Sequence, residues 1–173
     1  MRLKLIAVFT MVFLASCIIV PKPTSEQNTL VVGKFLVNWN RTDKMKGGSG
    51  TYKANILIYF QNDQTGKISV VSTLNKGWLL TRKLSDGNYK ILKYYIEQQY
   101  ENTIYKMTLT GTDFIIKIEE GKVNNLGTIQ IDIGNDGYSV RVVDFDVVKY
   151  DFKIEFKDSK WNSYDWKQTP IAP

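Results

Sequence analysis

The feature that most constrains this fold is a two-residue alternation of apolar and polar side chains, which recurs from residue 29 to residue 157. Because successive side chains of a β-strand point to opposite faces, this period predicts strands with one buried face. The alternation is clearest in "LGTIQIDIG", where Ile129, Ile131 and Ile133 are separated by polar residues. Turn residues interrupt the pattern about every eight to twelve positions, as in the "NDG" that follows, which predicts a hairpin.

Short strands joined by tight turns are typical of β-sandwiches and β-barrels. We expect strands at residues 29–39, 52–61, 68–74, 78–84, 89–100, 103–109, 113–120, 126–134, 138–148 and 150–156. No segment shows a convincing helical period. In the last two strands, the apolar residues expected to share buried faces are Val143, Phe145, Val147, Phe152, Ile154 and Phe156.

These patterns predict an all-β fold with a single antiparallel β-sandwich, and a small β-barrel is the alternative. The length of 173 residues suits one domain. We place the sandwich at residues 29–157, followed by an aromatic C-terminal tail at 158–173.

The composition argues against most enzyme chemistry. The chain contains no histidine and a single cysteine, Cys17, so it lacks the commonest general base and the commonest zinc ligand. It carries a net charge of +6 but no arginine-rich stripe, which disfavours nucleic acid as a partner. We therefore predict a protein without catalytic residues, metal or cofactor.

The cysteine lies at the end of an N-terminal leader. Residues 1–16, "MRLKLIAVFTMVFLAS", combine two positive charges, a short apolar stretch and small residues, which is the layout of a secretory signal peptide. The apolar stretch is shorter than the roughly 20 residues that a transmembrane helix needs. The sequence Leu14-Ala15-Ser16-Cys17 resembles the lipobox of bacterial lipoproteins at all four positions. The resemblance implies cleavage between Ser16 and Cys17, and a diacylglycerol on the cysteine sulfur.

The residues after the lipobox, 17–28, include two prolines and a polar run, which predicts a short extended tether rather than a packed element. The lipid would make the membrane the first partner of the protein. Ile18, in place of an aspartate, favours the outer membrane if the cell has one. We expect a lipid-anchored cell-envelope protein that binds or scaffolds an envelope protein or glycan. A surface-exposed adhesin or host-interaction lipoprotein is the alternative, followed by an envelope glycan hydrolase.

A second resemblance concerns the domain. "LSDGNYKI" (residues 84–91) and "IEEGKVNNLGTIQI" (residues 118–131) are similar to a pattern in transthyretin-like or carboxypeptidase-regulatory-like sandwich domains. The resemblance implies that the glycine of the first motif begins a strand and that its tyrosine packs on the opposing sheet. It implies that the second motif contains a turn between two strands. It describes a fold and no activity.

The aromatic tail supplies the first candidate site. Trp161, Tyr164 and Trp166 lie among polar residues near the end of the chain, and Trp39 and Trp78 stand at strand edges. Flat aromatic rings beside polar groups suit a platform for a sugar or a protein partner. The other interpretation is that the tail packs onto a face of the sandwich.

Acidic residues supply the remaining candidates. Asp144 and Asp146 would share one strand face about 7 Å apart, within the range that glycoside hydrolysis requires, although a solvated strand face gives the same pattern. "IDIGNDG" has a glycine where a calcium loop would need an Asp or Asn. Glu119 and Glu120 suit a polar turn.

Overall fold

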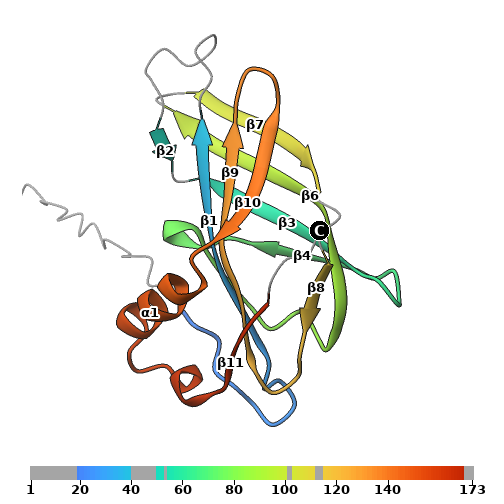
Figure 1. Cartoon of the computed structure of the whole chain (residues 1–173), viewed down its shortest axis with the longest axis vertical. Helices are drawn as coiled ribbons and strands as arrows, with labels where there is room; N and C mark the ends of the chain where they lie inside the picture. The colour runs from blue at the N-terminus through green and yellow to red at the C-terminus, as the bar shows by residue number, and fades with distance from the viewer. Residues whose placement is uncertain (1–18, 40–49, 53, 101–102, 112–114, 170–173) are drawn as a thin grey trace, which may run out of the picture.

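The computed structural model describes residues 19–39, 50–52, 54–100, 103–111 and 115–169. Two β-sheets pack face to face, and an α-helix lies against the outer face of one of them (Figure 1). The sheets remain separate and do not close into a barrel, which confirms the sandwich prediction over its barrel alternative.

The first sheet, sheet A, is built around two long parallel neighbours, β1 and β9. Its strands are β1 (Leu30–Trp39), β2 (Gly50–Tyr52), β5 (Trp78–Thr81), β9 (Val123–Ile133), β10 (Tyr138–Val143) and β11 (Trp166–Gln168). The free side of β1 pairs with β5 and then β2, and the free side of β9 pairs with β11 and then β10. The β1–β9 and β11–β9 pairs are parallel, so sheet A is antiparallel only in its other pairings.

The second sheet, sheet B, is antiparallel in every described pairing. Its strands are β3 (Asn55–Asn62), β4 (Ile68–Ser72), β6 (Gly87–Tyr100), β7 (Thr103–Thr110) and β8 (Ile115–Ile118). Their order is β4-β3-β6-β7, and β8 pairs with the first residues of β6. Figure 1 shows the long β6 and β7 crossing behind β9 and β10 of sheet A.

The main core lies between the two sheets and contains the alternating residues that the sequence singled out. Ile129, Ile131 and Ile133 are all buried there. A bulge in β9 makes these side chains point into the core. At the bulge the register against β1 shifts, because two residues of β9 oppose Gly33. Gly127 has a φ of 72°, the left-handed region that glycine tolerates. Without the extra residue, the three isoleucines would point out of the sandwich.

The strands predicted over residues 144–148 and 150–156 are wrong. β10 ends at Val143, Asp144 adopts a left-handed φ of 56°, and residues Phe145–Glu155 form the helix α1. The residues predicted to share buried strand faces are therefore divided around a helix: Phe152 is buried, whereas Val147 and Ile154 are exposed. An isolated helix of this length is marginal in water, so its packing on sheet A decides the structure.

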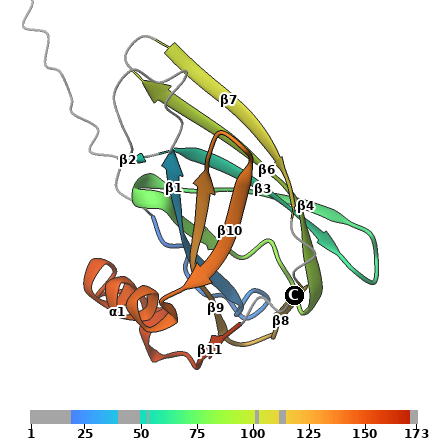
Figure 2. The same ribbon diagram turned by 45° about the horizontal axis from the view of Figure 1, so that its top comes forward.

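Beneath α1 lies a second core, which we call the outer core. Its buried members are Leu30, Val32, Trp78, Leu80, Val123, Val148, Phe152 and Trp161. Edge-to-face contacts order it, with the rings of Trp78 and Phe152 6.1 Å apart. The molecule therefore has three layers, sheet B, sheet A and a cover of α1 with the C-terminal segment (Figure 2).

The N-terminal segment corrects the tether prediction. Over the described residues 19–28 the chain has no regular structure, as expected, but it is packed rather than free. Val20 contacts the outer core, the carbonyl of Pro21 accepts a hydrogen bond from the indole of Trp161, and that of Lys22 accepts one from Arg82. Val20, the first packed residue among those described, lies three positions after Cys17.

Candidate functional site

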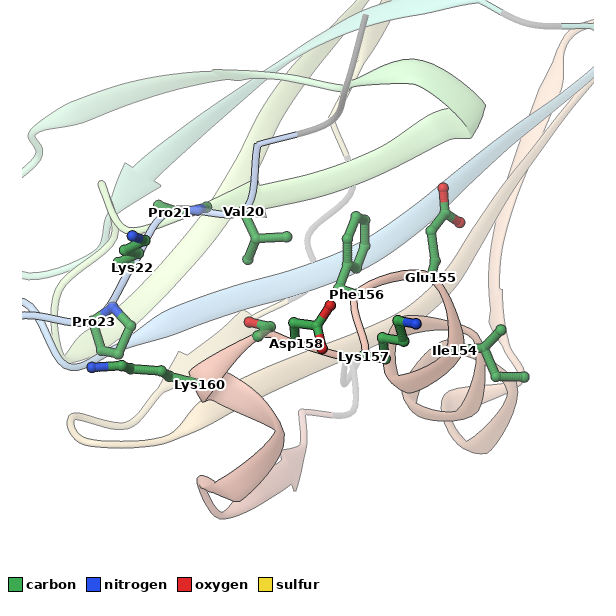
Figure 3. Close-up of a pocket in the computed structure, with 11 residues that line it drawn as sticks. Val20, Pro21, Lys22, Pro23, Ile154, Glu155, Phe156, Lys157, Asp158 and Lys160 are labelled. Carbon is green, nitrogen blue, oxygen red and sulfur yellow. The ribbon is translucent and has the colours of Figure 1, made fainter. Parts of the chain in front are cut away.

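A groove of about 440 Å³ separates the N-terminal segment from the end of α1 (Figure 3). Residues 20–23 form one wall, and residues 154–160 form the other. Val20 and Phe156 both pack against the outer core from these walls. Lys22, Lys157 and Lys160 also line the groove. It is therefore apolar at its base and mainly basic at its rim.

Hydrogen bonds between side chains and the backbone hold the chain that turns out of α1 into the 3₁₀ helix η2 (Lys160–Ser163). The side-chain amide of Asn162 donates to the carbonyls of Phe156, at 2.9 Å, and Lys157, at 3.0 Å. The Ser159 hydroxyl accepts from the amide of Trp161 at 3.4 Å, and the Trp161 ring fills the outer core. These bonds hold the wall of the groove that follows α1 in place.

The acidic groups on the sandwich side of α1 are neutralised by sheet A and η1 (Asn75–Gly77). Glu155 accepts hydrogen bonds from Lys76 at 2.8 Å and from the Trp78 indole at 3.0 Å. Burial raises the pKa of Glu155, but these hydrogen bonds outweigh it and hold the pKa below its usual value. Asp151 pairs with Lys34, whose ammonium also lies 4.6 Å from the Trp78 ring centre.

The outer side of α1 carries an exposed apolar stripe. Val147, Tyr150 and Ile154 are 49%, 66% and 59% exposed, and their spacing places them on one side of the helix, opposite Val148 and Phe152. Large apolar residues on a solvent-facing helix surface mark interaction sites when they are grouped. Ile19, at the start of the described N-terminal segment, is 83% exposed.

The aromatic tail is brought together, but as packing. Trp161 is 0% exposed, so its ring has no face open to a ligand in this arrangement. The Tyr164 ring lies 4.7 Å from that of Trp161, and the Trp166 ring lies 5.1 Å from that of Phe152. The interpretation in which the tail packs onto a sandwich face matches this arrangement. Trp39 and Trp78, expected at strand edges, are also buried.

The acidic candidates do not converge on a cleft. Asp144 precedes α1 and Asp146 lies in its first turn, where it accepts a hydrogen bond from Gln168 at 3.2 Å, so the strand spacing predicted for this pair is wrong. Among the described residues there is no group of three or more acidic, histidine or cysteine side chains suited to a metal ion. Glu119 and Glu120 begin the turn between β8 and β9, as predicted. In Glu119, hydrogen bonds from Lys167 and then Lys122 lower the pKa from 4.5 to about 2.

The remaining sequence motifs occupy the turn and the strand start that were predicted for them. The "NDG" turn closes the β9–β10 hairpin, with the Gly134 amide donating to Gly137 at 2.8 Å. Gly87 begins β6 with a φ of 137°, and Tyr89 is buried in the core between the sheets. The hairpin agrees with the prediction from the "NDG" turn, and Gly87 and Tyr89 lie where the pattern at residues 84–91 implied. The transthyretin-like resemblance itself stays a prediction.

Sequence reasoning missed the groove and the helix that borders it. The signal was present, because Phe145, Val148, Phe152 and Phe156 follow the three- and four-residue spacing of a helical face. Phe145 also alternates with Val143 and Val147, and Phe152 and Phe156 alternate with Ile154, so a strand interpretation was favoured in these strand-rich surroundings.

The residues of the predicted lipidation site, Ser16 and Cys17, and the signal peptide at 1–16 lie outside the described residues. Over the residues that the structure does describe, no helix is both long and apolar enough to cross a membrane. Comparison of the chain with protein-family models, with curated proteins and with solved structures returned no match.

Proposed function

We propose that this protein is an exported lipoprotein whose β-sandwich is held at a membrane by a diacylated Cys17 and serves a binding or scaffolding role in the cell envelope. The observation that carries the proposal is the position of Cys17, directly after a charged and apolar leader and in a four-residue lipobox. Two or more acyl chains make such anchoring stable without a transmembrane helix.

The outer face of sheet B supports a binding role. Ile68 and Val70 of β4 and Ile115 of β8 project from this face and are 51%, 38% and 40% exposed. Lys93 lies 4.3 Å from the ring centre of Tyr59 between them. Exposed apolar side chains set among charged ones, such as the Lys106–Glu97 pair, are the mixture found at the surface of a protein–protein interface.

Lipidation is tested in a bacterium that expresses the full chain and is fed an alkyne-tagged palmitate. The wild-type protein should carry the tag and sediment with membranes, and its mature N-terminus should be Cys17. Cys17→Ser should remove the tag and leave an unprocessed precursor. Ser16→Ala keeps a residue that the lipobox accepts and is the matched control. An untagged wild-type protein would end the lipoprotein proposal.

The side on which the protein works is tested by protease shaving of intact cells, with a periplasmic protein as the control. Resistance until the outer membrane is broken places the domain in the periplasm and supports a role inside the envelope. Loss of the domain while the control survives would favour the adhesin or host-interaction alternative.

Binding of a partner by the outer face of sheet B is tested by photo-crosslinking in cells. A crosslinker at Val70 should give a crosslinked product of one mass, and a crosslinker at Arg141 on sheet A should not give that product.

A further inference from the structure

We propose that the outer side of α1, together with Ile19 and the basic rim of the groove, is a docking face for the anionic bilayer in which the protein is anchored. We call this surface the α1 face; its apolar members are Ile19, Val147, Tyr150 and Ile154, and its basic members are Lys22, Lys153, Lys157 and Lys160. The inference rests on the proposed lipidation of Cys17 and adds an orientation to it.

The first argument is chain length. Three peptide units link Cys17 to Val20, so their Cα atoms are at most about 10 Å apart. Val20 is packed on the outer core at one wall of the groove, whose other wall is the end of α1 (Figure 3). When the acyl chains of Cys17 are in the bilayer, the domain cannot move away from it, and the α1 face is the part of the domain next to the anchor.

The second argument is the chemistry of the exposed side chains. An interfacial helix places an apolar stripe at the boundary of headgroups and acyl chains and flanks it with lysines. Val147, Tyr150 and Ile154 form such a stripe on α1, and Lys153 is exposed beside them. Tyrosine is enriched at this boundary because one end of its ring is apolar and the other is polar.

The third argument is how the charges are divided. The acids Asp151 and Glu155 are paired with Lys34 and Lys76, and the exposed Asp144 and Asp146 lie at the N-terminal end of α1, away from the groove. Positive charge therefore dominates the exposed rim, where Asp158 stands against three lysines of the groove. Anionic lipid headgroups attract clusters of lysine that lie close to the membrane surface. With α1 toward the bilayer, the outer face of sheet B points away from it, on the far side of the sandwich (Figure 2).

The test uses the lipidated full chain, extracted in detergent and reconstituted into vesicles of phosphatidylethanolamine and phosphatidylglycerol. The sulfur of Cys17 is blocked by its thioether, so Tyr150→Cys introduces one reactive thiol for an environment-sensitive fluorophore. Thr108→Cys, at an exposed position on β7 in sheet B, is the matched control. Val147→Cys repeats the measurement on the same stripe in case one substitution disturbs folding.

Nitroxide-labelled lipids should quench the fluorophore at position 150 at least about twofold more than at position 108, since an interfacial helix lies about 5–10 Å into the boundary region. The emission at position 150 should also shift to the blue. Changing Lys153, Lys157 and Lys160 to Gln, or using phosphatidylcholine alone, should reduce this quenching.

The other outcomes separate the two proposals. A protein that does not partition into vesicles overturns the lipid anchor and, with it, this inference. A protein that partitions but shows equal quenching at positions 150 and 108 overturns the docking face alone. A blue shift at position 150 without nitroxide quenching would show that another protein, such as a second copy, covers α1, and it would also overturn the docking face.

Discussion

The outer face of sheet A has two halves that differ although the same two strands, β1 and β9, run through both. In the covered half, Leu30, Val32 and Val123 point outward and are buried beneath α1 and the C-terminal segment. In the open half, the outward residues Asn38 and Asp132 are polar and only partly buried. The comparison teaches that the polarity of the residues on the outer face of a sheet decides whether a further layer, here α1 and the C-terminal segment, packs on that face.

The two halves are also stabilised by different forces. The covered half depends on removing large rings from water, and one such aromatic side chain contributes several times more than a surface ion pair. In the open half, Asp132 accepts hydrogen bonds from Asn38 at 2.7 Å and Gln130 at 2.9 Å and faces Arg141 at 3.4 Å. Lys34 marks the border, since it pairs with Asp151 of α1 and contacts the ring of Trp78.

The largest effect is expected from Trp161→Ala in the covered half. The ring is 0% exposed and its indole holds Pro21, so its loss should destabilise the fold by about 3–5 kcal/mol. Urea denaturation of the wild type and the variant measures this. Arg141→Ala in the open half is the control and should cost less than about 0.5 kcal/mol. If Trp161→Ala left stability intact but abolished binding of a ligand, the platform interpretation would replace packing.

The second-largest loss of stability is expected from Asn125→Ala. This side chain links the first residue of α1, in the covered half, to the bulge of β9. The buried Asn125 amide donates to the Phe145 carbonyl at 2.7 Å, and its oxygen accepts from the Gly127 amide at 2.9 Å. Leaving these groups unsatisfied should cost about 1–3 kcal/mol. Circular dichroism and urea denaturation report helix content and stability.

Asn125→Asp is the matched variant, because it keeps the acceptor for Gly127 and removes the donor to Phe145. It should disturb α1 while preserving the bulge. Equal stability of both variants and the wild type would mean that α1 is positioned by the outer core alone.

A smaller, pH-dependent effect is expected from Glu119→Gln at the end of the covered half, where Lys167 of β11 contacts the turn before β9. The folded-state pKa of about 2 lies below the ordinary 4.5, so the carboxylate stabilises the fold above pH 4.5 and this contribution is lost as the pH falls to about 2. The difference in urea midpoint between wild type and variant should therefore shrink across this range. Glu120→Gln, in the same turn, is the control, and a difference that stays constant with pH would contradict the prediction.

The smallest effect is expected from Asp132→Asn in the open half. The hydrogen bonds from Gln130 and Asn38 hold the pKa of Asp132 below its usual range, but the side chain remains partly exposed. Screening by water limits the loss to about 1 kcal/mol or less. A loss as large as that from Asn125→Ala would show that the two halves do not differ as described.

Much of the sandwich could be predicted from residue patterns. Strand alternation places Ile129, Ile131 and Ile133 on one face, and the "NDG" turn predicts the hairpin after them, because both signals act over a few residues. The strand boundaries of β1 and β4 agree with the predicted segments to within two residues at each end. What could not be predicted is that β1 and β9 pair in parallel, since partners far apart in the chain leave no local signal.

The candidate site was less predictable than the fold. The aromatic side chains of the tail were singled out, but Trp161 proved to be a core residue. Its burial depends on Val20 and Pro21, which are distant from it in sequence. The groove was missed because it is formed by two segments more than a hundred residues apart, and a tether and a predicted strand gave no reason to pair them.

The sequence by itself determined the period of the strands, the turns between them and the place of a single cysteine behind an apolar leader, because these properties depend on neighbouring residues. The tertiary structure alone decided that residues 145–155 form a helix. The apolar residues there suit either period, and the helix places both Val148 and Phe152 in the outer core with Trp78 and Val123. It also decided that the N-terminal segment is packed, because its partners are brought together only by folding.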